Sequence, residues 1–232
     1  MAAVFSVVVL TAPPPGVGSD PGGYGVKIDG REALLRTVEL FLNRDNVKQV
    51  LVAVEAAQME EAKRKYGNHL AFSGVKLAQS TNRWADQIAA TAEKLVPEAT
   101  HVIVHDASRP AVPYTDIEAV MEAAEKHDAV TLVAALKAAL LELDEGGGPV
   151  AAQPATRFVQ VLTPQAFSRA KFLEMAKSKQ DLHASQWTTV KGSPLNIRLG
   201  GGPDASVVKA MIGMLPKPKL KAPSSPFEEA QW

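Results

Sequence analysis

Short runs of apolar, mostly β-branched residues alternate along the chain with longer segments whose apolar positions recur every three to four residues. The short runs are typical of buried strands, and the periodic segments are typical of amphipathic helices. The predicted strands are Ala3–Thr11, Val47–Val54, Gly74–Ala78, His101–His105, Ala129–Leu136, Val159–Leu162 and Leu195–Leu199. The predicted helices are Glu32–Leu42, Ala57–Tyr66, Arg83–Leu95, Thr115–His127, Gln165–Ser178 and Ala205–Leu215.

The predicted strands are continuously apolar instead of alternating between apolar and polar residues, which indicates that both faces of the sheet are covered. Strands that alternate with helices predict an α/β fold with a mostly parallel sheet. In such folds, ligands bind beyond the carboxyl ends of the strands. We therefore expect the functional residues in the loops that follow Leu10, Ala78 and His105.

Two stretches fall outside this alternation. Residues 137–160 include the sequence Gly-Gly-Gly-Pro at 146–149, and we expect them to form a protruding arm. Residues 216–232 are rich in Pro and Lys, which predicts a disordered tail. The remaining chain, residues 1–215, is predicted to form a single domain.

Composition narrows the possible functions. The 232 residues include 25 Lys plus Arg, 25 Asp plus Glu, and no Cys. The lack of Cys excludes disulfides, zinc–thiolate sites and thiol nucleophiles, and the zero net charge argues against a nucleic-acid partner. No apolar run approaches the length of a membrane span. The Val-rich N-terminus lacks the basic segment of a signal peptide, so we expect a cytoplasmic protein that does not bind membranes.

The motif His-Asp-Ala-Ser-Arg-Pro at 105–110 directly follows a predicted strand. Asp106 would stand at the ligand edge of the sheet, where a carboxylate can hold a divalent metal or a ribose hydroxyl. Arg109 can pair with a phosphate. The alternative is that Asp106 and Arg109 form an ion pair that only braces the loop, and spacing does not separate the two.

This motif resembles that of the 2-C-methyl-D-erythritol 4-phosphate cytidylyltransferases. Two further segments resemble the same family: Leu-Thr-Pro-Gln-Ala-Phe at 162–167 and Gln-Ser-Thr-Asn-Arg at 79–83. The resemblance spans roughly residues 4–213. It implies a three-layer, Rossmann-like nucleotidyltransferase fold with a central, mostly parallel mixed sheet and a protruding dimerisation arm, which would form a homodimer. It also implies a reaction that joins CTP to a sugar-alcohol phosphate and releases pyrophosphate, with Mg²⁺ on the triphosphate.

The resemblance assigns candidate roles residue by residue. Lys27 and Arg109 would be catalytic, and Asp106 would also hold the metal. The residues expected to bind the nucleotide are Ala12, Gly16, Gly18, Arg83, Asp86, Asp106 and Ala107. Those expected to bind the second substrate are Arg157, Thr163 and Lys209, with Arg157 reaching the site from a partner subunit.

The chain departs from the family mainly in its first loop. Residues 13–25 contain four Pro and five Gly, and no Lys or Arg occurs before Lys27, whereas the family loop carries an Arg and a Lys. Proline lacks the N–H group that a phosphate cradle uses. Asp86 stands in place of a family Ser, and the family's later Asp-Thr pair falls within Lys137–Leu141.

These departures leave three hypotheses. The chain is a cytidylyltransferase whose activity is weak or lost, because the basic loop is replaced. Alternatively, it is a non-catalytic paralogue that binds a ligand or a protein partner through the old cleft. A third possibility is a nucleotidyltransferase with a different substrate, in which Lys27 is the remaining loop cation.

Overall fold

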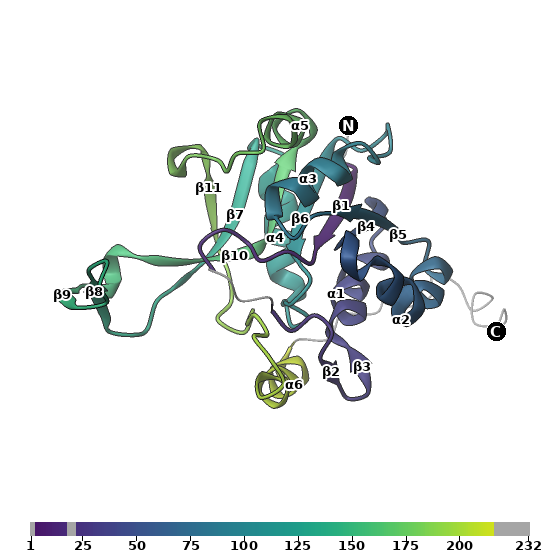
Figure 1. Ribbon diagram of the computed structural model, residues 1–232. Helices are drawn as coiled ribbons and strands as arrows, with labels where there is room; N and C mark the ends of the chain where they lie inside the picture. The colour runs from purple at the N-terminus through teal and green to yellow at the C-terminus, as the bar shows by residue number, and fades with distance from the viewer. Residues whose placement is uncertain (1–2, 18–21, 216–232) are drawn as a thin grey trace, which may run out of the picture.

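A computed structural model describes residues 3–17 and 22–215 (Figure 1). Gly18 and the predicted tail at 216–232 lie outside the described residues. The main sheet has seven strands in the order β11-β7-β10-β6-β1-β4-β5. Their bounds are β1 Phe5–Leu10, β4 Val47–Glu55, β5 Lys76–Ser80, β6 His101–Asp106, β7 Ala129–Ala135, β10 Val159–Ser168 and β11 Thr188–Lys191.

Helices cover both faces of this sheet, as continuous apolar strands require. The bounds of the covering helices are α1 Ala33–Leu42, α2 Met59–Phe72, α3 Trp84–Ala92, α4 Tyr114–Ala124 and α5 Arg169–Ser178. Alternate residues of β1 point to opposite faces: Val7 and Val9 pack in the cluster that contains α1, α2 and α4, while Val8 and Leu10 pack with α3 and α5. The three-layer fold with a mostly parallel mixed sheet is confirmed.

The register of the sheet brings several strand ends to one edge. Leu10 of β1 lies beside Asp106 of β6, and Glu55 of β4 lies beside Ser80 of β5, all in parallel pairs. Strand β10 runs antiparallel to both β6 and β7. Because β10 crosses in the opposite direction, its Thr163 comes to the end of β6 and not to the far edge.

Two predicted elements are wrong. Leu195–Leu199 is a loop, because its backbone bonds to other loops and not to a strand: the Leu199 N–H donates to the Ser108 carbonyl. Its apolar Leu199 is buried against Ile28 and α6 Asp204–Met214 instead of in the sheet. The helix predicted from Gln165 begins at Arg169, because residues up to Ser168 pair with β6 and β7 as strand β10.

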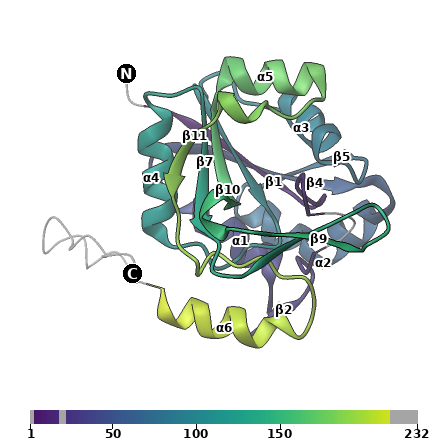
Figure 2. The same ribbon diagram turned by 90° about the vertical axis from the view of Figure 1, so that its left-hand side faces the viewer.

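Smaller elements complete the part of the chain that the structure describes. The short strands are β2 Lys27–Ile28, β3 Arg31–Glu32, β8 Leu140–Leu143 and β9 Pro149–Gln153, and three short 3₁₀ helices lie at Ala56–Gln58, Ala155–Arg157 and Ala184–Gln186. The β2–β3 hairpin lies beside α6 in both views (Figures 1 and 2). The β8–β9 hairpin projects from the body as an arm (Figure 1).

The described residues include no helix that is both long and apolar enough to cross a membrane.

Candidate functional site

The carboxyl end of β6 carries a buried aspartate, Asp106, that is paired with two arginines. Its Oδ2 atom lies 2.8 Å from Nε of Arg198 and 3.7 Å from Nε of Arg109. Its Oδ1 atom accepts a hydrogen bond of 2.9 Å from the Ser108 N–H. Burial raises the pKa of the Asp106 carboxyl, and both guanidinium groups and the Ser108 N–H oppose that rise. The sequence left open whether Asp106 and Arg109 bind ligands or form an ion pair that braces the loop, and in this structure the ion pair is formed.

A hydrogen-bond chain behind Asp106 fixes the orientation of the loop. The His105 ring is fully buried, with Nε2 3.1 Å from the Arg109 carbonyl and Nδ1 2.9 Å from Thr163 Oγ1. A carbonyl only accepts, so Nε2 carries the proton and Nδ1 accepts from the Thr163 hydroxyl. Thr163 Oγ1 in turn accepts from the Asp106 N–H at 3.1 Å. Burial lowers the pKa of His105 to about 3, which keeps the ring neutral.

Arg109 is held on its other side by a residue that the sequence analysis missed. Its Nη1 donates to the Asn196 carbonyl at 2.7 Å, and the Asn196 side-chain amide donates to the Thr163 carbonyl at 2.6 Å. Nε of Arg109 has no hydrogen-bond acceptor among the described residues and faces Asp106 at 3.7 Å. Arg109 is therefore positioned by the same network that positions Thr163.

Arg198 is the cation that the sequence analysis missed. Its side chain is 8% exposed, and it reaches Asp106 from the loop that had been predicted as a strand. The signal available was that the predicted strand Leu195–Leu199 contains two polar residues, Asn196 and Arg198. The structure places Lys209, which was expected to bind the second substrate, at the surface on α6, where its Nζ pairs with Asp29 at 2.6 Å.

Lys27 lies on strand β2 with its side chain 64% exposed, and its Nζ is 3.8 Å from Glu32 Oε1. The first loop nevertheless returns to the Asp106 site at Gly22. This residue has a φ of +72°, and a Cβ there would fall 2.3 Å from Ser108 Oγ and 2.6 Å from Arg198 Nη2. Only glycine fits this position, so the loop packs tightly against Arg198.

The start of the first loop is held by α3. Ala12 is buried, and its N–H donates to Gln87 Oε1 at 3.1 Å. Ala107, on the neighbouring strand end, is also fully buried, and its N–H donates to the Leu10 carbonyl at 2.9 Å. Gly16 is exposed with a φ of +81° and no neighbouring atom near its Cβ position. Of the expected nucleotide-binding residues in this loop, Gly16 is therefore the more accessible.

The second loop presents an ion cluster in place of a neutral hydroxyl. Asp86 lies 2.9 Å from Lys179 Nζ and 3.7 Å from Arg83 Nη1, and it accepts a 2.7 Å hydrogen bond from the Thr81 hydroxyl. The hydrogen bonds from Lys179 and Thr81 are the main causes that lower the pKa of Asp86. Arg83 and Asp86 therefore form a local ion pair, and Lys179, at the C-terminal end of α5, joins it.

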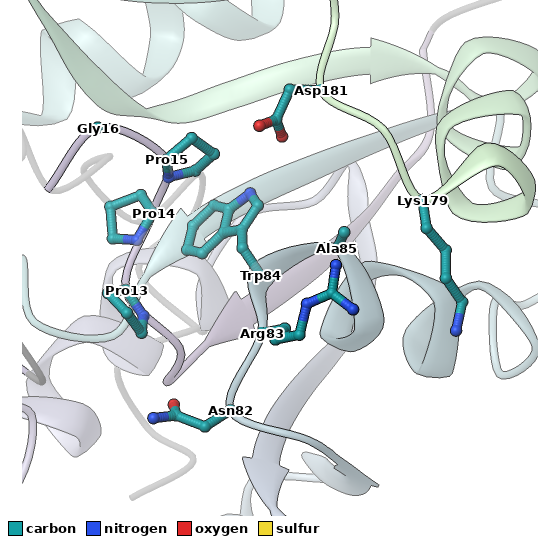
Figure 3. A pocket seen from close by; sticks show the side chains of 10 residues that line it. All are labelled: Pro13, Pro14, Pro15, Gly16, Asn82, Arg83, Trp84, Ala85, Lys179 and Asp181. Atoms are coloured by element: carbon teal, nitrogen blue, oxygen red, sulfur yellow. The ribbon is translucent and has the colours of Figure 1, made fainter. Parts of the chain in front are cut away.

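A cavity of about 360 Å³ lies between these two loops (Figure 3). One wall is Pro13–Gly16 and the other is Asn82–Ala85, with Lys179 and Asp181 at the rim. The rings of Pro14 and Pro15 stand opposite the Trp84 indole in Figure 3. The volume is within the range of small-ligand sites. The cavity therefore joins two segments that the sequence analysis had singled out separately.

Arg157 lies apart from these groups, exposed in the 3₁₀ helix at the root of the arm. Among the described residues, Asp106 contacts Arg109 and Thr163, and Gly16 and Arg83 both line the cavity.

The described side chains do not fit a magnesium ion as they are arranged. Both oxygens of Asp106 are already bonded, and Arg198 would have to leave Oδ2 before a metal could take its place. Proteins commonly hold Mg²⁺ through one or two carboxylates together with substrate phosphates. No group of three His, Cys, Asp or Glu side chains suited to a metal occurs among the described residues.

Known proteins resemble this chain in sequence. The first relatives are a bifunctional IspD/IspF enzyme of Desulforudis audaxviator, 26% identical over 92% of this chain and 57% of that protein, and a 2-C-methyl-D-erythritol 4-phosphate cytidylyltransferase of Frankia casuarinae, 29% identical over 70% of this chain and 61% of that protein. The chain thus spans little more than half the length of these two relatives. A cytidylyltransferase of Saccharopolyspora erythraea is 24% identical over 81% of this chain and 89% of that protein.

Solved structures resemble the fold. A 4-diphosphocytidyl-2C-methyl-D-erythritol synthase from Anaerococcus prevotii matches with a TM-score of 0.72 at 15% identity, covering 91% of this chain and 97% of that one. A 2-C-methyl-D-erythritol 4-phosphate cytidylyltransferase from Thermus thermophilus matches with a TM-score of 0.67 at 22% identity, covering 88% and 96%. A family model for 2-C-methyl-D-erythritol 4-phosphate cytidylyltransferase matches residues 18–208, a match that begins after Pro13–Gly16. This chain belongs to the 2-C-methyl-D-erythritol 4-phosphate cytidylyltransferase family.

Proposed function

We propose that this chain binds CTP along the carboxyl edge of the sheet, from the cavity between the first and second loops to the end of β6, and slowly transfers the cytidylyl group to 2-C-methyl-D-erythritol 4-phosphate. Family membership supports the reaction. One observation carries the slow rate: the cations that reach Asp106, Arg198 and Arg109, are both within 4 Å of its carboxylate. The Asp106 carboxylate therefore partly neutralises both guanidinium groups before any phosphate binds.

The chemistry requires cations more than covalent catalysis. A phosphate oxygen of the sugar-alcohol phosphate attacks the α-phosphorus of CTP, a new P–O bond forms, and the bond to the β-phosphate oxygen breaks to release pyrophosphate. Charge spreads over the oxygens of the transferred phosphoryl group in the transition state. Arg198 and Arg109 lie beside Asp106 at the end of β6, where they would contact these oxygens in the bound substrate.

The first loop adds little to this stabilisation. Its prolines offer no N–H to a phosphate, and Lys27 faces Glu32 on an exposed hairpin. Removing a single transition-state donor typically costs about 10²–10³ in rate. We therefore expect turnover lower by at least this factor than in a relative that keeps a basic first loop.

A continuous pyrophosphate-release assay with CTP, 2-C-methyl-D-erythritol 4-phosphate and Mg²⁺ tests the proposal. Slow release that Arg198→Met abolishes, and that the surface variant Lys126→Ala leaves unchanged, is the expected result. Release as fast as in a relative with a basic loop would contradict the slow rate. No release, together with CTP binding, would favour the non-catalytic alternative.

That alternative has a specific observation in its favour. Asp106 is 1% exposed and bonded on both oxygens, so the site resembles a stabilised core element as much as a catalytic one. The cavity between the two loops has both apolar and charged lining residues. It could bind a ligand in a protein that does not catalyse a reaction. Binding of CTP with no detectable pyrophosphate release, at any concentration of the second substrate, would support this function.

The arm supports a homodimer as part of the proposal. Its exposed apolar side chains, which a solvated hairpin does not need, are Leu141, Leu143, Val150, Phe158, Val159 and Val161. Arg157 lies among them at the root of the arm, where it would reach the partner's site. Sedimentation equilibrium should show a dimer, and Leu141→Glu combined with Val150→Glu should give a monomer.

A further inference from the structure

Helix α3 carries a polar side chain on its buried face that the proposed reaction does not use. Gln87 is fully buried, and its buried neighbours on the same face of α3 are Trp84, Ile88 and Thr91. A buried amide costs free energy unless its donors and acceptor are bonded. We therefore expect hydrogen-bond partners for both the carbonyl oxygen and the NH₂ group of Gln87.

Its acceptor holds the first loop. Gln87 Oε1 accepts hydrogen bonds from the Thr11 N–H at 2.9 Å and from the Ala12 N–H at 3.1 Å. These are the first two residues after β1, directly before Pro13–Pro15. The prolines have no N–H of their own, so Gln87 takes the last two main-chain donors before the proline run.

Its donor holds the second loop. Gln87 Nε2 donates to the Thr81 carbonyl at 3.1 Å, and it also lies 3.3 Å from Thr11 Oγ1. Thr81 immediately precedes the cavity wall Asn82–Ala85, and Thr11 and Ala12 immediately precede the opposite wall Pro13–Gly16. The Gln87 amide therefore connects the residues that directly precede the two cavity walls.

We propose that Gln87 is a positioning residue that sets the separation of the two cavity walls and so determines how tightly a nucleotide is held between them. This inference rests on the proposed function, because it assigns the cavity to CTP. An amide is suited to the task, since it accepts from one loop and donates to the other. A purely apolar residue would fill the same space without connecting the loops.

Three variants separate positioning from general stability. Gln87→Leu keeps the volume and removes every bond to both loops. Gln87→Glu keeps an acceptor for Thr11 and Ala12 but turns an oxygen toward the Thr81 carbonyl. Thr91→Val is the matched control, because Thr91 is fully buried one turn later and its hydroxyl bonds only to carbonyls of its own helix, those of Gln87 and Ile88.

Isothermal titration calorimetry with CTP and Mg²⁺ on the folded full chain gives the readout, with circular dichroism to confirm folding. We expect Gln87→Leu to weaken CTP binding by about tenfold or more, from the loss of two or more buried hydrogen bonds. Gln87→Glu should fall between Gln87→Leu and the wild type, and Thr91→Val should stay within about twofold of the wild type. In turnover assays the loss should fall on KM more than on kcat.

Equal CTP affinity of Gln87→Leu and Thr91→Val would overturn the positioning role while the proposed function stands. If Gln87→Leu does not fold, the Gln87→Glu comparison decides: an affinity equal to that of the wild type would overturn the role in the same way. A wild-type chain that binds no CTP would overturn both, and only this outcome bears on the proposed function.

Discussion

Two regions at the same sheet edge use their polar groups in opposite ways. After β6, the side chains of Asp106 and Arg109 are 1% and 5% exposed, and they bond to one another and to the loops around them. Between the first and second loops, Arg83 is 71% exposed beside an open cavity, and the prolines opposite it carry no N–H. The first region is closed by its own contacts, and the second is open to a ligand.

The 105–110 motif, which carries the family resemblance, and the open cavity are therefore separate parts of this sheet edge. His105, Asp106 and Arg109 are held by buried hydrogen bonds and ion pairs that the fold itself requires. The motif that carries the family resemblance therefore has a structural role whether or not chemistry takes place. The open cavity has no such requirement, and its first wall, Pro13–Gly16, lies before residue 18, where the match to the family begins.

Asp106→Asn should produce the largest effect on stability. The substitution keeps the volume but leaves the Arg109 and Arg198 guanidinium groups buried without their carboxylate. Removing one partner of a buried ion pair typically costs about 3–5 kcal/mol. Urea unfolding of the wild type and the variant measures the loss in unfolding free energy. A loss under about 1 kcal/mol would mean that the ion pairs of Asp106 with Arg109 and Arg198 do not stabilise this edge.

Acidification should destabilise the closed region through His105. Its pKa is lowered from 6.5 to about 3 in the folded chain, so between these values the unfolded chain takes up a proton that the folded chain excludes. The contribution of the neutral ring to stability is complete above pH 6.5 and is lost as the pH falls, by about 1.4 kcal/mol per unit at most. Urea unfolding between pH 4 and 7 should show this slope.

His105→Gln is the matched variant for that slope. A glutamine amide can still donate to the Arg109 carbonyl, but it does not titrate. The opposing contribution of Asp106, whose pKa is raised by burial, is shared by both chains. The stability of His105→Gln should therefore fall less steeply on acidification than that of the wild type, and equal slopes would show that His105 is not the titrating group.

Thr163→Val should have a smaller effect. It removes the hydroxyl that donates to His105 Nδ1 and accepts from the Asp106 N–H, and it leaves two buried groups unsatisfied. The expected loss is about 2 kcal/mol in unfolding free energy. Thr163→Ser keeps the hydroxyl and should lose less stability, whereas a valine variant as stable as the wild type would show that the two hydroxyl hydrogen bonds do not stabilise the fold.

Arg83→Ala should have the smallest effect on stability and a measurable effect on binding. The side chain is mostly exposed, so the unfolding free energy should change by no more than about 0.5 kcal/mol. CTP affinity should weaken a few-fold, because the cavity loses a cation. A large loss of stability without a change in affinity would reverse the contrast between the two regions.

Most of the fold could be predicted from the sequence, because its signals are local. Continuous apolar runs such as Val50–Val54 indicated the strands, and apolar positions three to four residues apart indicated α1. Leu195–Leu199 was predicted wrongly because an apolar pattern alone does not distinguish a strand of the sheet from a buried loop. The contacts that make it a loop, of Leu199 with Ile28 and with the Ser108 carbonyl, join segments that are far apart in the sequence.

The candidate site could be predicted only where its residues lie within sequence motifs, such as those at 105–110 and 162–167. Asp106 and Arg109 are three positions apart, so their pairing could be anticipated. The contacts of Arg198 and Gln87 join segments separated by 92 and 76 positions, and no periodicity reports such pairs. An amide on the buried face of a predicted helix, beside Trp84 and Ile88, was the only local sign of Gln87.

Urea unfolding with and without CTP tests most directly whether this chain keeps a nucleotide site beside its closed sheet edge. A ligand that binds only the folded state stabilises it by about 2.7 kcal/mol at about 100 times its dissociation constant. We expect the unfolding free energy of the full chain to rise by this amount in CTP with Mg²⁺. An unfolding free energy that stays constant at every soluble concentration of CTP would contradict the account.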